Sequence, residues 1–369
     1  MKPSLLLLIT FVALPAFRPA LADPLTPEQA LGKALFFDTR LSQPAGQACA
    51  SCHTPQTGFS DPARRAISPG IVPGRFGNRN APSVAYAAFS PEFGFDEKEG
   101  IFVGGQFLDG RAATLEEQAS GPFTNPLEMA NPDMTTVLEK VRTAPYASQF
   151  DRVYGPRALD EENTGIRNLI RALTAYERSA ELSPFTSRYD AWLAGKAQLT
   201  AQELRGLEIY EAEDKGNCAA CHPSRPADDG SPPLFTDFTY DNLGVPPNPD
   251  NPFYRQEARF NPDGVAYVDR GLGVPTGDPA RDGKFKVPTL RNIARTGPYM
   301  HNGVFETLEE VVDFYNSRDT GDWPAPEVDA NVNREELGDL GLTEQEMADL
   351  VAFLHTLTDA EPPDTQQAD

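Results

Sequence analysis

Apolar residues recur every three to four positions in several stretches of the chain, as they do along the buried face of an α-helix. In the clearest stretch, 163–180, the recurring positions are Ile166, Leu169, Ile170 and Leu173. The same spacing predicts helices over 132–143 and 343–357. Thr343, with Glu346 three residues later, forms a capping-box signal that begins the last of these helices. Strand signals are sparse, so the pattern predicts a mainly α fold.

One long segment lacks this periodicity. Residues 223–284 are rich in Pro, Gly, Asp and Asn, which favour turns and loops. The 369-residue chain contains 29 Gly and 35 Pro, a combined share above the roughly 12% of average proteins. We therefore expect long irregular loops between the helices.

Three short phrases occur twice, in the same order and with matching internal spacing. The pairs are Leu25-Thr26 with Gly32 and Leu199-Thr200 with Gly206; Asn80-Ala-Pro-Ser-Val and Lys286-Val-Pro-Thr-Leu; and Thr114-Leu-Glu-Glu and Thr307-Leu-Glu-Glu. The first and third phrases carry helix-start signals. An ordered repeat of this kind indicates an internal duplication. It predicts two related domains, 23–160 and 161–369.

The first 22 residues have the features of a secretory signal peptide. Lys2 is followed by a short apolar run over 5–14 and by the cleavage sequence Ala20-Leu21-Ala22. The run is too short to span a membrane, and no later segment reaches 18 apolar residues. We expect cleavage after Ala22 and a periplasmic protein with no membrane span.

The charge balance is strongly acidic. The 54 Asp and Glu residues outnumber the 32 Lys and Arg, giving a formal net charge of −22. This argues against nucleic acid as a partner and is compatible with a basic protein partner.

The four cysteines fall into two identical motifs. These are Cys49-Ala-Ser-Cys52-His53 and Cys218-Ala-Ala-Cys221-His222. C-x-x-C-H is the attachment site of a c-type haem: two thioethers hold one edge of the porphyrin, and the adjacent histidine ligates the iron. Disulfides or a zinc site would leave the adjacent histidines unexplained. The motifs predict two covalent haems, with His53 and His222 as proximal ligands.

The duplication also suggests what lies on the far side of each iron. Tyr315 follows Thr307 by eight residues, whereas Pro122 follows Thr114 by eight. If the domains superpose, the second iron faces a phenol and the first a proline, which has no donor atom. The first haem would then be five-coordinate and open. Met300 is an alternative ligand for the second iron, and Tyr315 could instead be an ordinary aromatic residue of a buried helix face.

Groups for proton transfer lie close to the open position in the sequence. Glu128 is six residues beyond Pro122, and Gln118 is one helical turn before it. An open haem beside an acid–base group is typical of a peroxidase rather than of a simple electron carrier. Of the remaining histidines, His301 is interpreted as a hydrogen-bonding residue near a haem or as a structural residue, and His355 as an ordinary helix residue.

Four motifs resemble those of the bacterial dihaem cytochrome c peroxidase/MauG family. They are the runs 104–111 (GGQFLDGR), 125–129 (NPLEM), 286–292 (KVPTLRN) and 296–305 (TGPYMHNGVF). The resemblance covers nearly all of the mature chain and implies two cytochrome c-like haem domains. It places Glu128, Gln118 and Pro122 in the peroxide pocket. It also makes Tyr315 the ligand of the six-coordinate haem, as in the MauG-like branch, where the peroxidases proper carry methionine.

The resemblance further implies one Ca²⁺ between the haem domains. Its ligands would be Asn80, Thr296 and Pro298, two of them through backbone carbonyls.

Two positions depart from the family pattern. MauG and many relatives have a tryptophan between the haems, where this chain has Leu108, and another before the second haem motif, where it has Gly216. The electron route therefore cannot be transferred from the family. Trp192, Trp323 and Tyr86 are candidates for carrying electrons in place of the missing tryptophans.

The favoured function is a hydrogen-peroxide-dependent oxidation of residues, tryptophan above all, on a partner protein through a high-valent dihaem state. A tyrosinate ligand supports it, since this hard anionic donor lowers the haem potential. The first alternative is a peroxidase that takes electrons from a small cytochrome or cupredoxin. The second is a non-catalytic electron-transfer cytochrome.

Overall fold

A threonine begins each of five main helices. The side chains of Thr26, Thr114, Thr200, Thr307 and Thr343 each accept a hydrogen bond from the backbone N–H three residues later. Such caps satisfy donors that a helix start would otherwise leave unpaired. The duplicated helix-start phrases are thus confirmed as real starts.

The computed structural model describes residues 24–360, so the expected signal peptide lies outside the described residues. Within them the helices are α1 (Pro27–Phe36), α2 (Leu115–Thr124), α3 (Met134–Arg142), α4 (Ala147–Tyr154), α5 (Glu162–Glu177), α6 (Arg188–Leu193), α7 (Ala201–Glu211), α8 (Gly273–Thr276), α9 (Leu308–Ser317) and α10 (Glu344–His355). Two antiparallel pairs of short strands complete the fold: β1 (Gly94–Asp96) with β2 (Ile101–Val103), and β3 (Tyr240–Asp241) with β4 (Phe285–Lys286). The mainly α prediction is confirmed.

The three helices predicted from periodicity are present as α3, α5 and α10, with ends shifted by one to three residues. The prediction missed α4 and α6. Helix α4 has no side-chain cap at its start, so its sequence carries no start signal.

Two helix crossings repeat in the two halves of the chain. In α1, a Cβ added to Gly32 would lie 1.8 Å from the carbonyl oxygen of Ala172 in α5. In α7, a Cβ added to Gly206 would lie 2.0 Å from that of Asp349 in α10. Only glycine allows such close approach of two backbones. The structure therefore contains the duplication as two equivalent helix pairs, α1–α5 and α7–α10.

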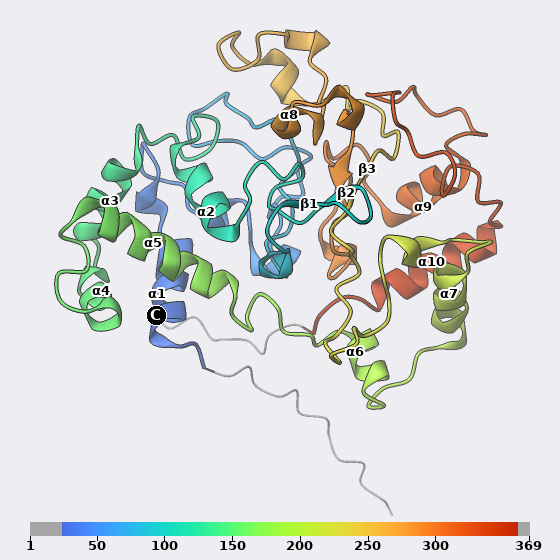
Figure 1. Cartoon of the computed structure of the whole chain (residues 1–369), viewed down its shortest axis with the longest axis horizontal. Coiled ribbons are helices and arrows are strands. Elements are labelled where there is room, and N and C mark those ends of the chain that lie inside the picture. Colours follow the sequence, from blue (N-terminus) through green and yellow to red (C-terminus); the bar gives the residue numbers. More distant parts are fainter. Residues whose placement is uncertain (1–23, 361–369) are drawn as a thin grey trace, which may run out of the picture.

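Helix α5 moves the domain boundary. Its residues Leu169, Ala172 and Leu173 belong to the first hydrophobic core, which extends to Leu182, whereas the second core begins at Tyr189. The boundary predicted at residue 160 is therefore too early, because α5 is the packing partner of α1. Figure 1 shows α1 to α5 in one lobe and α6, α7, α9 and α10 in the other.

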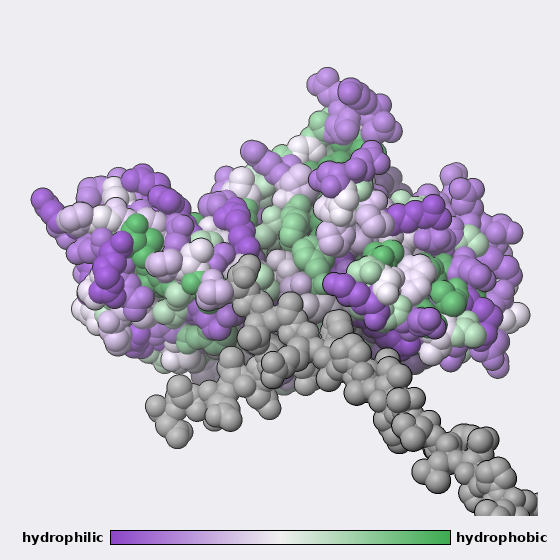
Figure 2. Space-filling view, turned by 90° about the horizontal axis from the view of Figure 1, so that it is seen from below, coloured by the Kyte–Doolittle hydropathy of each residue, from purple (hydrophilic) through white to green (hydrophobic). Residues whose placement is uncertain are grey.

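The segment 223–284 is largely irregular, as predicted, with short helical turns and α8 in the part that projects from the molecule in Figure 1. Hydrophilic residues cover most of both lobes in the view of Figure 2, as expected from the high charge. In residues 24–360, no helix combines the length and apolar character needed to cross a membrane.

Candidate functional site

A cavity of about 490 Å³ lies between residues of both lobes. Every site residue predicted from the sequence lines it: Cys49, Cys52, His53, Asn80, Leu108, Gln118, Pro122, Glu128, Cys218, Cys221, His222, Thr296, Pro298 and Tyr315. Residues far apart in the chain thus converge on one space. His355 is exposed at the end of α10 and does not belong to this lining.

The two motif histidines have the same environment. His53 Nδ1 lies 3.1 Å from the carbonyl oxygen of Phe59, and His222 Nδ1 lies 2.7 Å from that of Phe235. A carbonyl oxygen only accepts, so Nδ1 carries the proton in each ring and Nε2 keeps its lone pair. Burial lowers the pKa of both histidines, partly offset by these hydrogen bonds. Neutral imidazoles oriented in this way are suited to ligate iron.

The cysteines of each motif are held by a single 3₁₀ turn, Cys49–Ser51 in one domain and Cys218–Ala220 in the other. None of the four forms a disulfide. Burial raises the pKa of every one of these thiols, to about 11 for Cys52. Neutral thiols and an oriented histidine on the wall of a largely apolar cavity fit a covalently attached haem.

Helices α2 and α9 form matching walls. The lining residues of α2 are Leu115, Gln118, Ala119 and Pro122, and those of α9 are Leu308, Val311, Val312 and Tyr315. The two sets have the same spacing from the capping threonines, Thr114 and Thr307. Pro122 therefore occupies in the first domain the position of Tyr315 in the second.

The carboxyl group of Glu128 is positioned by one neighbour. Asn125 Nδ2 donates a 2.6 Å hydrogen bond to Glu128 Oε1. Burial raises the pKa of this carboxyl, while the Asn125 hydrogen bond and the charge of Arg111 lower it in part. Gln118 lines the same cavity from α2. A buried carboxyl with a raised pKa is suited to act as an acid–base group in such a cavity.

Tyr315 is enclosed near the second motif. Burial raises the pKa of its phenol, and the nearby thiols of Cys218 and Cys221 act in the same direction. Met300 also lines the cavity, so both candidates for the sixth ligand reach it.

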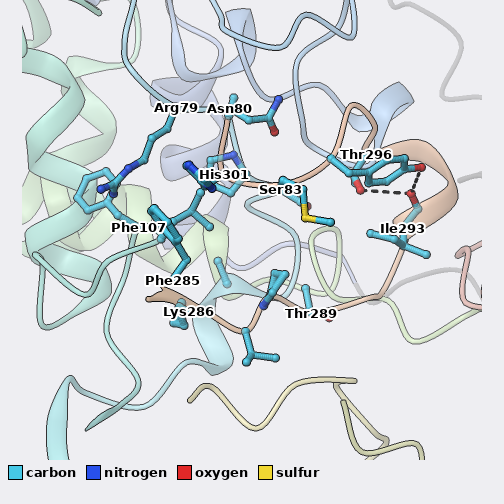
Figure 3. A pocket seen from close by; sticks show the side chains of 18 of the residues that line it. Arg79, Asn80, Ser83, Phe107, Phe285, Lys286, Thr289, Ile293, Thr296 and His301 are labelled. Carbon is cyan, nitrogen blue, oxygen red and sulfur yellow. Dashed lines mark hydrogen bonds between the residues drawn. The ribbon is translucent and has the colours of Figure 1, made fainter. Parts of the chain in front are cut away.

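A charged cluster forms part of the wall near Leu108. Arg79 pairs with Asp109 at 2.7 Å and with Asp269 at 2.6 Å. His301 Nε2 lies 3.0 Å from Glu327 Oε2. Figure 3 shows Arg79 and His301 in this wall, with Phe285 beside His301, and the Phe285 and His301 rings stack with centroids 3.9 Å apart. His301 is thus held in the wall, in line with its interpretation as structural.

The three residues predicted to hold calcium all line the cavity. Asn80 Nδ2 donates a 3.0 Å hydrogen bond to the carbonyl oxygen of Ala66, which leaves the Oδ1 of Asn80 for another partner. No hydrogen bond from the described residues reaches the backbone oxygens of Thr296 or Pro298. An amide oxygen and two carbonyls are donors that fit Ca²⁺.

The positions that depart from the family pattern have distinct surroundings. Leu108 lines the cavity, and a Cβ at Gly216 would lie 2.6 Å from the carbonyl oxygen of Ile209, so this backbone excludes a side chain there. Of the candidate relay residues, Tyr86 reaches the cavity wall, whereas Trp192 and Trp323 do not line it.

Two ionisable residues of the wall were given no chemical role from the sequence: Glu177, which is buried, and Lys286, which is half-buried. Glu177 ends α5, and Lys286 Nζ donates to the carbonyl oxygen of Gly105 at 2.9 Å. Burial lowers the pKa of Lys286 to about 8. No local signal in the sequence distinguishes Glu177 from an ordinary charged residue at a helix end.

Two C-x-x-C-H motifs that open on one cavity between duplicated helical domains define a dihaem c-type protein. Residues 26–198 match the family model described as di-haem cytochrome c peroxidase. The chain is 40% identical to the methylamine utilization protein MauG of Paracoccus denitrificans, over 89% of this chain and 88% of that protein. It is 34% identical to the cytochrome-c peroxidase IdrP1 of Denitromonas iodatirespirans, over 95% and 85%. The chain belongs to the dihaem cytochrome c peroxidase/MauG family.

Solved structures agree. The diheme peroxidase BthA of Burkholderia thailandensis superposes with a TM-score of 0.79 at 36% identity, covering 93% of this chain and 88% of that one. A MauG-like protein associated with microbial copper homeostasis superposes with a TM-score of 0.68 at 32% identity, covering 95% and 96%. The protein is thus a peroxide-using dihaem oxidoreductase with two c-type haems.

Proposed function

We propose that the protein oxidises residues of a partner protein, tryptophan above all, with hydrogen peroxide as oxidant. The observation that carries this proposal is the match between α2 and α9, which puts Pro122 where the second domain has Tyr315. Proline offers no donor atom, so peroxide has access to the first site. The phenol occupies the corresponding place at the second.

The proposed ligands follow from the cavity lining. Cys49 and Cys52 would form the thioethers of the first haem, and His53 would ligate its iron. The equivalent residues of the second motif, with Tyr315 as sixth ligand, would hold the other haem. Bound there, the haems would supply the iron at which peroxide is reduced and the path through which electrons arrive.

The chain's own part in the chemistry is proton transfer. Glu128, oriented by Asn125, would take the proton from the near peroxide oxygen and return it to the far one, which assists cleavage of the O–O bond. Gln118 would orient the peroxide by hydrogen bonding. Reduction of one peroxide to two waters uses two electrons from the partner and two protons.

A Ca²⁺ held by Asn80, Thr296 and Pro298 would tie the two domains together, since Asn80 precedes the boundary and the other two follow it. We place the protein in the periplasm, because residues 1–22 have the sequence of a signal peptide and the same chain has two c-type haem attachment motifs.

The second candidate is a peroxidase supplied with electrons by a small redox protein. The acidic surface favours it, because a net charge of −22 attracts a basic donor. Steady-state turnover of the holoprotein with peroxide and reduced cytochrome c separates the two. Our proposal predicts negligible oxidation of cytochrome c and peroxide-dependent modification of a partner protein. Rapid turnover with cytochrome c would refute it in favour of the peroxidase.

A further inference from the structure

A second carboxyl group lies in the wall of the first haem site. Glu177 lines the cavity together with Cys49 and Pro122, and it is 5% exposed. Its Oε2 has no hydrogen-bond partner among residues 24–360. Burying an unpartnered carboxyl costs stability, so the residue requires an explanation other than packing.

The second domain provides an internal control. Ala172 of α5 and Asp349 of α10 occupy equivalent positions, because their carbonyl groups lie against Gly32 of α1 and Gly206 of α7. On this register Glu177 of α5 corresponds to Leu354 of α10, and both line the cavity. The fold therefore accepts leucine at this position. The acid occurs in the domain that has Pro122, where peroxide is proposed to react.

The electrostatic surroundings keep the Glu177 carboxyl protonated. Burial raises its pKa to about 8; the charge of Arg178 opposes this shift, and that of Glu116 adds to it. Glu128 faces the same region from the segment after α2, since both carboxyls raise the pKa of the Cys49 thiol. At neutral pH Glu177 thus holds a proton beside the cavity.

Polar groups that reach the surface lie one helical turn from Glu177 and beside it in the chain. Glu116, whose side chain is 44% exposed, accepts a hydrogen bond from Thr174 Oγ1 at 3.4 Å and forms an ion pair with Arg178 Nη2 at 2.8 Å. Thr174 lies one helical turn before Glu177 on α5. The solvent-exposed pair and the buried carboxyl therefore occupy successive turns of one helix.

We propose that Glu177 delivers protons from solvent to the peroxide pocket and acts through Glu128, which moves them at the substrate. In each delivery the O–H bond at Glu177 breaks, the proton passes through water to the pocket, and the carboxylate regains a proton from the Glu116 side. Two such transfers supply the two protons that reduction of one peroxide consumes, while the two electrons come from the partner. The inference rests on the proposed function.

The test uses the haem-loaded protein, hydrogen peroxide and ascorbate as a chemical electron donor, so that peroxide reduction consumes both electrons and protons. The rate of peroxide consumption is followed in stopped-flow experiments between pH 6 and 10. Glu177→Gln removes the proton at constant size, Glu177→Leu copies the residue of the second domain, and Glu177→Asp keeps a carboxyl. The matched control is Glu181→Gln, because Glu181 pairs with Lys33 at the surface. The absorption spectrum of each variant reports haem loading.

We expect the wild-type rate to fall as pH rises through about 8. Glu177→Gln and Glu177→Leu should lower the rate roughly a hundred-fold, the low end for positioned proton transfer, and remove this pH dependence. Glu177→Asp should retain the pH dependence, and the control should match wild type. A readout independent of turnover is the midpoint potential of the first haem, whose slope against pH should change near 8 in wild type and not in the Gln and Leu variants.

Wild-type rates and potentials in the Gln and Leu variants would overturn the proposal. So would an Asp variant that loses the pH dependence as fully as the Gln variant, since this would indicate a structural role. If wild type and control both fail to consume peroxide, the proposed function fails and proton delivery with it. That result is distinguishable from an effect confined to the Glu177 variants.

Discussion

The crossing of α7 and α10 should not tolerate a side chain at position 206. In Gly206→Ala the new Cβ would lie 2.0 Å from the carbonyl oxygen of Asp349 and 2.8 Å from the Cβ of Phe353. Ordinary contact begins at 3.4 Å, so α10 must move away by roughly 1.4 Å. The neighbouring atoms belong to a helix backbone and to the Cβ of a fully buried phenylalanine, which have little freedom to move.

The cost can be estimated from overpacking. Extra methylenes in tight cores cost about 1–3 kcal/mol, and a clash with backbone belongs at the upper end. The higher helix propensity of alanine stabilises the helix by about 1 kcal/mol relative to glycine. We therefore expect a net loss of about 2 kcal/mol, or a melting temperature lower by about 4–8 °C for a domain of this size.

Thermal unfolding of the holoprotein, followed by far-UV circular dichroism, measures this effect. Gly121→Ala in α2 is the control, because its Cβ would lie 3.5 Å from the Phe107 ring, an ordinary contact. The control should be as stable as wild type or up to about 1 kcal/mol more stable. Equal stability of Gly206→Ala and wild type would refute the close crossing, and with it the register that pairs α5 with α10.

Three further outcomes are expected. Burial alone would raise the pKa of Asp269, but Arg79 lowers it from 3.8 to about 2. The pair should therefore contribute roughly 2 kcal/mol to the free energy of unfolding above pH 4, and this contribution should be lost as the pH falls toward 2. Urea unfolding of Asp269→Asn should show a smaller loss of stability between pH 4 and pH 2. An unchanged loss would refute the role of this ion pair. Tyr315→Phe should convert the spectrum of the second haem from low-spin to high-spin, whereas an unaltered spectrum would favour Met300 as its sixth ligand. Chelation by EGTA should lower the melting temperature of wild type but not of Asn80→Ala, and equal effects would exclude this calcium site.

Local signals in the sequence predicted much of the fold and site. The threonine caps define where the helices begin, because capping depends on residues three positions apart. Counting from Thr114 and Thr307 placed Pro122 and Tyr315 on matching walls, since helices of the same start and spacing present the same face. The haem motifs are likewise local.

What the sequence did not reveal depends on contacts between distant residues. Arg79 pairs with Asp269, which lies 190 positions away in the sequence, and no local pattern predicts that pairing. The domain boundary was placed too early because α5 has the periodicity of any amphipathic helix, and only its packing on α1 assigns it to the first core. Glu177 looked like an ordinary charged residue at a helix end until the cavity showed which way it faces.

We infer that the first haem is open and that the second is closed by Tyr315. Electron paramagnetic resonance of the as-isolated diferric protein, before and after one equivalent of hydrogen peroxide, tests it most directly. We expect one high-spin and one low-spin ferric signal, both lost on addition of peroxide. Two low-spin signals that peroxide leaves unchanged would contradict it.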